Sequence, residues 1–396
     1  MRFEQKRLSG KFRQMLLNTA QAIAMLAGLA ACASQPSSDK ATAIATPIAG
    51  IVPDGVAIVS TLAGGSEKEG FADGQGSDAR FSSPHEIAID AAGNLYVADW
   101  NNRRIRKVTP KGEVSTLAGG WYDFVGGQGN SAMFYHPQGI AIDAAGNLYV
   151  ADSGEHCIRK ITPKGKVSAF AGSLDKYGYG GFADGQGSAV RFRAPAGIVM
   201  DAAGNLYVTD SGNHRIRKIT KRGEVTTLAG GGDHREPDFA DGQGSDAWFN
   251  YPRGIAIDAV GNLYVADTWN HRIRKITPKG EVSTLAGGGS VGSKKTESDR
   301  FADGQGSDAR FYAPHGIAID ASDNLYVTDR NNHRIRKVTK EGVVTTLAGG
   351  GTGFADGEGS TARFWGPTGI AIDAAGNLYV ADEKNQLIRK IEIRRP

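Results

Sequence analysis

The feature that most constrains the fold is a sequence motif that occurs six times. The stretch PAGIVMDAAGNLYVTDSGNHRIRKITKRGEVTTLAG begins at Pro195, and related stretches begin at five other prolines, the last of them shortened. Successive leading prolines are separated by 53, 58, 57, 62 and 53 residues, and they are Pro84, Pro137, Pro195, Pro252, Pro314 and Pro367. Self-similarity with a period of a few tens of residues is the signature of a repeat architecture. We therefore expect six copies of one supersecondary unit.

Each unit contains four short apolar segments that are typical of β-strands, with the patterns GIAID, NLYVAD, IRKIT and VSTLAG. The segments between them, such as Ala202 to Asn205 and Lys221 to Gly223, supply the Gly and Asn that tight hairpins require. A four-stranded meander cannot bury both of its faces alone, so successive units must stack. Radial stacking of four-stranded antiparallel sheets gives a β-propeller, and repeats of this length with hairpin turns suit it better than a β-helix.

The ends of the chain set the number of blades. The unit that starts at Pro367 has only three of the four strand segments, and the missing VSTLAG segment occurs near the start of the chain, from Val56 to Gly64. Pairing of the two ends closes the ring and removes unpaired strand edges. The sequence therefore predicts an all-β fold, a six-bladed propeller of four-stranded blades over residues 56–396.

The repeated word PxGIAIDAAGNLYVADxxNHRIRK resembles the NHL repeat. The Asn-His-Arg run is intact at Asn213 to Arg215, and the His-Arg pair also occurs at residues 271–272 and 333–334. Three blades depart from it, with Arg103-Arg104, His156-Cys157 and Gln386-Leu387 at the same place. The resemblance extends from Val56 to Ile393 and implies a six-bladed NHL propeller. Because such propellers include enzymes, ligand sensors and protein-binding platforms, the resemblance implies architecture rather than function.

Residues 1–31 have the pattern of an export signal. A basic start is followed by an apolar run from Met15 to Leu29, in which Asn18 and Gln21 make a permanent membrane span unfavourable. The run ends in Leu29-Ala30-Ala31-Cys32, which resembles the lipobox of bacterial lipoproteins. This resemblance implies that Cys32 is lipidated and that the mature protein is anchored in the cell envelope, with the outer membrane favoured. An ordinary secretory signal with an incidental cysteine is the alternative.

Residues 32–55 are rich in Ala, Ser, Thr and Pro, which predicts a flexible tether between the anchor and the propeller. Lipidation of Cys32 leaves Cys157 without a partner, so we expect no disulfide framework. The formal net charge of +4 falls near zero once the basic signal is removed, which argues against nucleic-acid binding. We expect a monomer that contacts the membrane only through its lipid.

The residues that recur once per blade have structural interpretations. An aspartate follows each first strand and stands before a turn, where its carboxylate can accept backbone N–H groups. The tyrosine of each NLYVAD segment is expected to fill the space between blades, and the Asp and Asn-His-Arg beyond it to form a hydrogen-bonded corner. The connector FADGQGSDARF lacks the alternating acids of an EF-hand, so we expect a Gly-rich turn with Ser77 as a helix cap and Phe81 as an anchor, rather than a calcium loop.

Function is expected where the repeats differ. The loops between second and third strands and the connectors between blades lie on one face of such a disc, and every tryptophan falls in them. Large aromatic side chains on a surface are enriched in binding sites. The candidate binding face is therefore marked by Trp100, Trp121, Trp248, Trp269 and Trp365.

The mouth of the central channel also varies between blades. The residue after the leading proline differs in every copy but two, and the glycine that follows it is replaced in the first blade only. The candidate residues at the mouth are His85, Glu86, Gln138, Arg253, His315 and Thr368. Arg253 suits a small polar or anionic ligand, while His85 and His315 are candidate metal ligands. Catalytic zinc needs about three protein ligands, and the position that would complete a threefold set is Ala196, so His136 or Glu86 would have to supply the third ligand.

Two functions remain open from the sequence. The first is a non-catalytic, envelope-anchored binding scaffold for a protein or a small polar or glycan ligand on the loop-rich face, which needs no cofactor. The alternative is a metal-dependent lyase or lactonase-like enzyme at the channel mouth, with Zn or Ca as its cofactor. A purely structural envelope component would differ from the first only in having no dedicated ligand.

Overall fold

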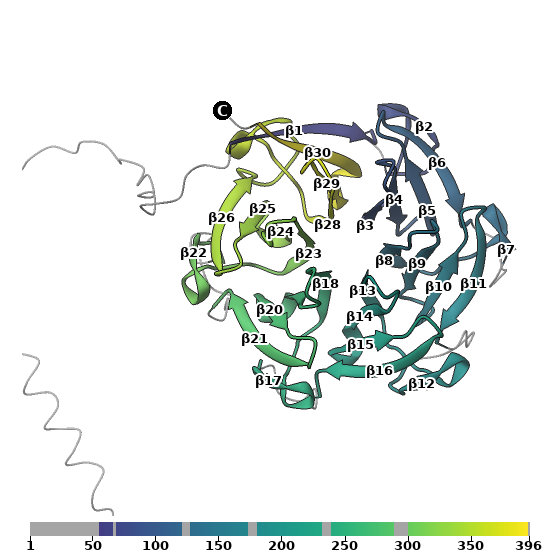
Figure 1. The fold of residues 1–396 in the computed structure, drawn as a ribbon. Helices are drawn as coiled ribbons and strands as arrows, with labels where there is room; N and C mark the ends of the chain where they lie inside the picture. Colours follow the sequence, from purple (N-terminus) through teal and green to yellow (C-terminus); the bar gives the residue numbers. More distant parts are fainter. Residues whose placement is uncertain are drawn as a thin grey trace, which may run out of the picture. The chain divides into compact units, whose positions relative to one another are not determined.

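The computed structural model describes residues 55–65, 69–120, 127–172, 180–231, 239–288 and 300–394. Six antiparallel sheets stand radially around a central channel in these residues, which confirms the predicted six-bladed propeller (Figure 1). The expected signal, Cys32 and most of the tether lie outside the described residues and stay predictions.

Each of the first five blades contains four strands in sequence order, from the channel outward. Blade 1 has β3 (Pro84–Ile89), β4 (Leu95–Asp99), β5 (Arg104–Val108) and β6 (Glu113–Ala118). Blade 2 has β8 (Pro137–Ile142), β9 (Leu148–Asp152), β10 (Cys157–Ile161) and β11 (Lys166–Ala171). Blade 3 has β13 (Pro195–Met200), β14 (Leu206–Asp210), β15 (Arg215–Ile219) and β16 (Glu224–Ala229). Blade 4 has β18 (Pro252–Ile257), β19 (Leu263–Asp267), β20 (Arg272–Ile276) and β21 (Glu281–Ala286). Blade 5 has β23 (Pro314–Ile319), β24 (Leu325–Asp329), β25 (Arg334–Val338) and β26 (Val343–Ala348).

Blade 6 joins the two ends of the propeller. It contains β28 (Pro367–Ile372), β29 (Leu378–Asp382) and β30 (Leu387–Arg394), and its fourth strand is β1 (Val56–Ala63). β1 runs antiparallel to β30, in a register that pairs Val56 with Arg394 and Val59 with Ile391 (Figure 1). The predicted closure of the ring by the N-terminal strand is therefore confirmed.

Every blade carries a fifth strand that the sequence did not predict. It is two residues long, comes from the connector that precedes the blade, and pairs with the outermost of the four main strands. These strands are β2 (Gly74–Gln75), β7 (Gly127–Gln128), β12 (Gly185–Gln186), β17 (Gly242–Gln243), β22 (Gly304–Gln305) and β27 (Gly357–Glu358). Because Gln75 pairs with Glu113, beside the turn between third and fourth strands, each connector reaches the end of the blade opposite to the leading prolines.

Short 3-10 helices follow these outer strands and also occupy several loops between second and third strands. Those in the connectors are η1 (Gly76–Asp78), η2 (Gly129–Ser131), η3 (Gly187–Ala189), η5 (Gly244–Asp246), η7 (Gly306–Asp308) and η9 (Gly359–Thr361). Those in the loops are η4 (Ser211–Asn213), η6 (Thr268–Asn270), η8 (Arg330–Asn332) and η10 (Glu383–Asn385). The expected cap by Ser77 is wrong, because Ser77 lies inside η1 and the cap position, Gln75, makes no side-chain cap hydrogen bond.

The hydrophobic core lies between neighbouring blades. Phe81, which is fully buried, packs in one cluster with Leu95 of blade 1 and with Tyr379 and Ile388 of blade 6. Equivalent clusters occupy the other junctions, each with one buried phenylalanine from a connector. The expected anchoring role of Phe81 and the interblade position of the tyrosines are thereby confirmed.

The recurring aspartates accept hydrogen bonds from the turn that follows each first strand, as expected. In blade 6, Oδ1 of Asp373 accepts the N–H groups of Ala375 and Asn377, and Oδ2 accepts the hydroxyl of Tyr379. Farther along the blade, Asp382 accepts a hydrogen bond from the Asn385 side chain, which confirms the Asp–Asn part of the predicted corner. These carboxylates are engaged within their own blade and form no ring of ligands. The histidine expected in this corner contacts the next blade instead, as His271 does at Ala313.

Candidate functional site

The first strands of the six blades line the channel, and their leading prolines all stand at the same end of it. At this end a narrow cavity of about 10 Å³ is lined by His85, Glu86, Gln138, Arg253 and His315, together with Ala196 and several glycines. Five of the six residues that the sequence assigned to the channel mouth therefore meet in one place.

Thr368, the sixth of these residues, does not line that cavity. Its side chain is fully buried, and its hydroxyl donates to the carbonyl oxygens of Pro84 and His85 at 3.1 and 3.2 Å. Thr368 therefore lies at the junction between blades 6 and 1, where it ties the last blade to the first.

His85 and His315 form a pair at the centre of the mouth. Their ring centroids lie 5.7 Å apart with the planes at 69°, and only 8% and 7% of the two residues is exposed. Burial, followed by the charge of Arg253, holds the pKa of each imidazole well below its usual value, so both rings are neutral near pH 7. The Nδ1 atom of each ring is buried and has no hydrogen-bond partner among the described residues. Nε of the buried arginine that recurs in the third strand, Arg274 for example, is unpartnered in the same way among the described residues, so the two imidazole atoms mark places that a ligand or water can fill only because they lie beside the cavity.

An aromatic stack extends from this pair toward the loop of blade 1. The Trp100 ring stacks on His85 with centroids 5.5 Å apart, and on His136 with centroids 4.0 Å apart. The buried Nε1 of Trp100 also lacks a hydrogen-bond partner among the described residues. Trp100 therefore contacts the mouth through His85, although it does not itself line the cavity.

Arg253 brings positive charge into the same space. Its Nη1 donates across the ring to Oε1 of Gln138 at 3.1 Å, and no described carboxylate forms an ion pair with it. Burial and the nearby charge of Arg330 lower its pKa from the ordinary arginine value, which still leaves it charged. Arg330 itself is neutralised by Glu383, 2.7 Å away. The mouth therefore holds one guanidinium that forms no ion pair among the described residues, although the charge of Glu383 acts on it, beside two neutral imidazoles and the carboxyl group of Glu86.

The sequence reasoning missed Arg330 and Glu383. Both occupy the position directly after the aspartate that ends each second strand, at the loop that rises over the mouth. The residues at this position differ strongly between blades, being Trp100, Ser153, Ser211, Thr268, Arg330 and Glu383. A comparison of the six blades at the residue after this aspartate would have identified both, because that position is as variable as the residue after each leading proline.

The remaining tryptophans occupy different surroundings. Trp269 and Trp365 are 57% and 43% exposed, and Trp365 lies beside the ammonium of Lys384, 5.8 Å from its ring centroid. Trp248 is half-buried on a connector, where its carbonyl accepts a hydrogen bond from Arg274. Trp121 lies outside the described residues. A shared binding face for these four side chains stays a prediction.

The described residues show no cluster of three or more His, Cys, Asp or Glu side chains placed to hold a metal ion. The connector aspartate that suggested a calcium loop is engaged otherwise, because Asp73 pairs with Arg106 at 2.7 Å and accepts the hydroxyl of Thr116. Cys157 is a buried free thiol whose pKa is raised by burial.

Six segments of the chain match the NHL repeat, one in each blade. They are residues 81–108, 134–161, 192–219, 249–276, 311–338 and 364–391. The chain is built from NHL repeats. Within the described part of the propeller, no helix has the length and apolar character needed to cross a membrane.

Curated proteins are similar in sequence to about 70% of this chain. Protein SUPPRESSOR OF QUENCHING 1 of Arabidopsis thaliana is 31% identical over 294 residues, which is 69% of this chain and 26% of that protein. Human NHL repeat-containing protein 2 is 31% identical over 318 residues, which is 70% of this chain and 42% of that protein. The NHL chain thus spans less than half the length of these relatives.

Solved structures share the fold at low sequence identity. An auxiliary nutrient binding protein from Bacteroides thetaiotaomicron matches with a TM-score of 0.61 and 20% identity, covering 85% of this chain and 76% of that one. A gluconolactonase from Xanthomonas campestris matches with a TM-score of 0.53 and 14% identity, covering 85% and 90% of the two chains. A binding protein and an enzyme share this architecture, so the function must be argued from the site.

Proposed function

We propose that this NHL propeller is an envelope-anchored binding protein that holds a small anionic ligand, such as a carboxylate or a phosphate, at its channel mouth. The observation that carries the proposal is Arg253, a largely enclosed guanidinium with no paired carboxylate among the described residues. A buried charge without a counter-ion is costly, and an anionic ligand would remove that cost.

The groups around Arg253 suit such a ligand. The unpartnered Nδ1 atoms of His85 and His315 can donate hydrogen bonds to an anion, for which the cavity of about 10 Å³ must widen. Because the two imidazoles are neutral near pH 7, their contribution is directional hydrogen bonding rather than charge. The name of the Bacteroides nutrient binding protein, which shares the fold, is consistent with a binding role.

The envelope location rests on the sequence of the first residues. The run that ends in Cys32 supports a lipid anchor there, with the propeller held on the tether of residues 32–55. A protein partner at Trp269 and Trp365 is compatible with this arrangement, since both side chains are substantially exposed.

A metal-dependent enzyme is the second candidate, and one observation favours it. The unpartnered Nδ1 atoms of His85 and His315 belong to rings 5.7 Å apart, and imidazole nitrogens are common zinc ligands. Zinc titration of the full chain distinguishes the two candidates. An enzyme site would hold about one zinc ion and lose it in His85→Ala and His315→Ala, whereas a binding site for anions would not require it.

The proposal is tested by isothermal titration calorimetry of the full chain with acetate, succinate and inorganic phosphate. We expect at least one of them to bind, and Arg253→Gln to weaken it by roughly tenfold or more, because hydrogen bonds to a charged group contribute about 1.5–3 kcal/mol. Arg222→Gln is the matched control, since Arg222 is exposed in a turn at the opposite end of the disc. Absence of binding by all three anions, or equal binding by the Arg253 variant, would contradict the proposal.

A further inference from the structure

Glu86 breaks a packing rule that the other five blades obey. At the second position after the leading proline, those blades carry Gly139, Gly197, Gly254, Gly316 and Gly369. A Cβ atom on any of these glycines would overlap the carbonyl oxygen of the residue after the leading proline in the next blade. Close approach of the inner strands therefore requires glycine at this level of the channel. Blade 1 carries a glutamate there instead, so this position serves something other than packing.

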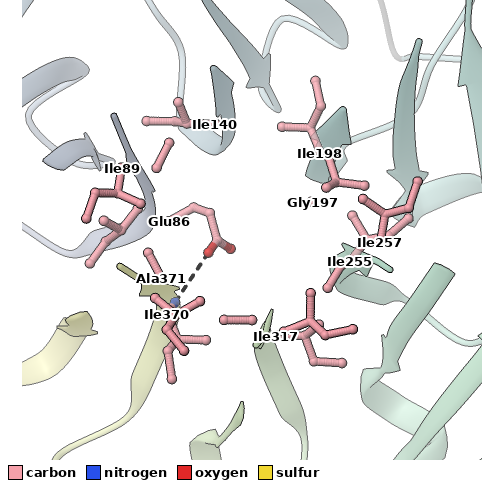
Figure 2. Close-up of a pocket in the computed structure, with 17 residues that line it drawn as sticks. Glu86, Ile89, Ile140, Gly197, Ile198, Ile255, Ile257, Ile317, Ile370 and Ala371 are labelled. Carbon is pink, nitrogen blue, oxygen red and sulfur yellow. Dashed lines mark hydrogen bonds between the residues drawn. The ribbon is translucent and has the colours of Figure 1, made fainter. Parts of the chain in front are cut away.

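The carboxyl group of Glu86 points into the channel below the mouth (Figure 2). It lines a cavity of about 220 Å³ whose other lining residues are isoleucine, valine, alanine and glycine, among them Ile140, Ile198, Ile255 and Ile317. The cavity is thus an apolar tube with a single acidic side chain.

The described residues give this carboxyl group few hydrogen bonds and no ion pair. Its Oε1 accepts one long hydrogen bond, from the backbone N–H of Ile370 at 3.4 Å, and no described cationic side chain forms an ion pair with it (Figure 2). Burial raises the pKa of Glu86 to about 7. Two backbone N–H groups, those of Ile370 and Ile87, stabilise the ionised form, but burial outweighs them. A carboxylate without a cationic partner in an apolar cavity is unfavourable, so a cation that enters the cavity gains a strong hydrogen-bond acceptor.

We propose that this cavity, which adjoins the mouth at Arg253 and shares Glu86 and Gly197 with it, binds a small apolar ammonium ion. The ammonium group donates to the Glu86 carboxylate, and a short alkyl body packs against the isoleucines. A volume of about 220 Å³ fits a ligand of a few carbon atoms and is below the range of roughly 300–1,000 Å³ that is typical of drug-sized ligands.

An organic cation fits this cavity better than a hard metal ion. Calcium takes six to eight oxygen ligands. Glu86 supplies the only side-chain oxygens that line the cavity, and every other lining side chain is a hydrocarbon. An alkylammonium ion needs one anionic acceptor and an apolar wall, and both are present.

The test is a calorimetric titration of the full chain with n-butylammonium chloride, with n-butanol, butyrate and calcium chloride as comparison ligands. We expect n-butylammonium to bind at least tenfold more tightly than n-butanol or butyrate, and calcium not to compete. Glu86→Gln keeps the size of the side chain and should weaken n-butylammonium binding tenfold or more. Glu86→Gly introduces the residue that the other five blades carry and should weaken n-butylammonium binding by the same factor. It is the variant to use if Glu86→Gln folds poorly.

The pH dependence gives an independent readout. The groups nearest to the cavity on the mouth side are Arg253, which stays charged, and His85 and His315, which stay neutral near pH 7. The affinity of the wild type for n-butylammonium should therefore rise between pH 6 and pH 8, as Glu86 ionises, and the Gln variant should show no such rise.

Arg253→Gln separates this proposal from the anion site, because it should weaken anion binding whereas the loss of a positive charge near the shared Glu86 should not weaken n-butylammonium binding. The proposal is overturned if n-butylammonium does not bind, if Glu86→Gln and Glu86→Gly bind it as the wild type does, or if calcium displaces it. If the wild type binds n-butylammonium but none of the anions, that result counts against the anion site at Arg253 only.

Discussion

The Nδ1 atom of His333 in blade 5 accepts a hydrogen bond from the backbone N–H of Gly366, 3.1 Å away at the entrance to blade 6. His156, His214 and His271 make the same contact to Ala194, Tyr251 and Ala313 in the blades that follow them. In blade 6 the side-chain oxygen of Gln386 replaces the imidazole and accepts the N–H of Ser83 at 2.6 Å. The histidine of the NHL repeat therefore joins one blade to the next by a hydrogen bond.

Substitution of His271 tests this interblade hydrogen bond. Glutamine reproduces the acceptor, as Gln386 does in blade 6, whereas methionine of similar length has no comparable acceptor. We expect His271→Gln to change the free energy of unfolding by less than about 0.5 kcal/mol and His271→Met to lower it by about 1 kcal/mol, since a neutral hydrogen bond contributes that much. Urea unfolding followed by tryptophan fluorescence measures both. Equal losses in the two variants would show that the acceptor atom is unimportant.

The same contact predicts a pH dependence. Burial and the charge of Arg272 lower the pKa of His271, and the neutral ring is the form that accepts the Ala313 N–H. The unfolded chain therefore takes up a proton near pH 6.5, before the folded chain does, and stability falls as the pH drops below that value. The difference in unfolding free energy between wild type and His271→Gln should shift in favour of the variant between pH 7.5 and pH 5. A difference that stays constant over this range contradicts the assignment.

Arg274 illustrates a second recurring contact that is expected to carry much of the stability of a blade. Its fully buried guanidinium lies 2.8 Å from Asp267 and 2.7 Å from Asp241, and it donates to the carbonyl oxygen of Ala240. Arg274→Met leaves Asp267 buried without its cation, so we expect a loss of about 3–5 kcal/mol in unfolding free energy. Arg222→Met, in an exposed turn of blade 3, should change it by less than about 0.5 kcal/mol. Comparable losses in the two variants, measured by urea unfolding, would argue against this role.

The regular part of the fold could be predicted because the same strand and turn segments recur six times in the sequence. Each strand segment recurs with its turn residues, and the unmatched segment at Val56 identifies the closing strand. The fifth strands could not be predicted, because a pair such as Gly74–Gln75 is too short to show a hydrophobic period. The role of the repeated histidine was also out of reach, since its partner Ala313 stands 42 residues away from His271 in the chain.

The candidate site was predictable only at the level of single strands. Arg253, His315 and Glu86 stand out because they interrupt a repeat, and the shared position after each leading proline places them at one end of the channel. Their sequence positions say nothing about which atoms remain without partners. Compensation of Arg330 by Glu383, for instance, depends on two loops of adjacent blades meeting side by side.

Lipidation of Cys32 predicts a specific behaviour of the whole protein. The chain has two cysteines, and the other, Cys157, is buried. In a bacterial host, Cys32→Ser should abolish incorporation of an alkyne-labelled fatty acid and move the protein from the detergent phase to the aqueous phase in a Triton X-114 partition. Cys157→Ser is the matched control and should leave both readouts unchanged. Labelling that persists in the Cys32 variant would remove the basis for the anchor.

Glu86 is expected to lower the stability of the propeller in the absence of a ligand. Burial raises its pKa from 4.5 to about 7, so between these values the folded chain keeps a proton that the unfolded chain has lost. Stability therefore falls as the pH rises from 4.5 to 7, by about 3 kcal/mol in total at 1.36 kcal/mol per unit of pKa. We expect Glu86→Gly to be more stable than the wild type at pH 8, and the margin to shrink toward pH 4.5.

Urea unfolding of both proteins at pH 4.5, 6 and 8 measures this margin, with Glu86→Gln as the variant that keeps the side-chain volume. The Gln variant should lose the pH dependence as the Gly variant does, because the ionisable group is absent from both. A margin independent of pH would show that Glu86 ionises freely in the channel. If the margin at pH 8 narrows when n-butylammonium is added to all three proteins, the stability lost to this carboxylate is recovered by its ligand, because a ligand that binds only the folded state stabilises it.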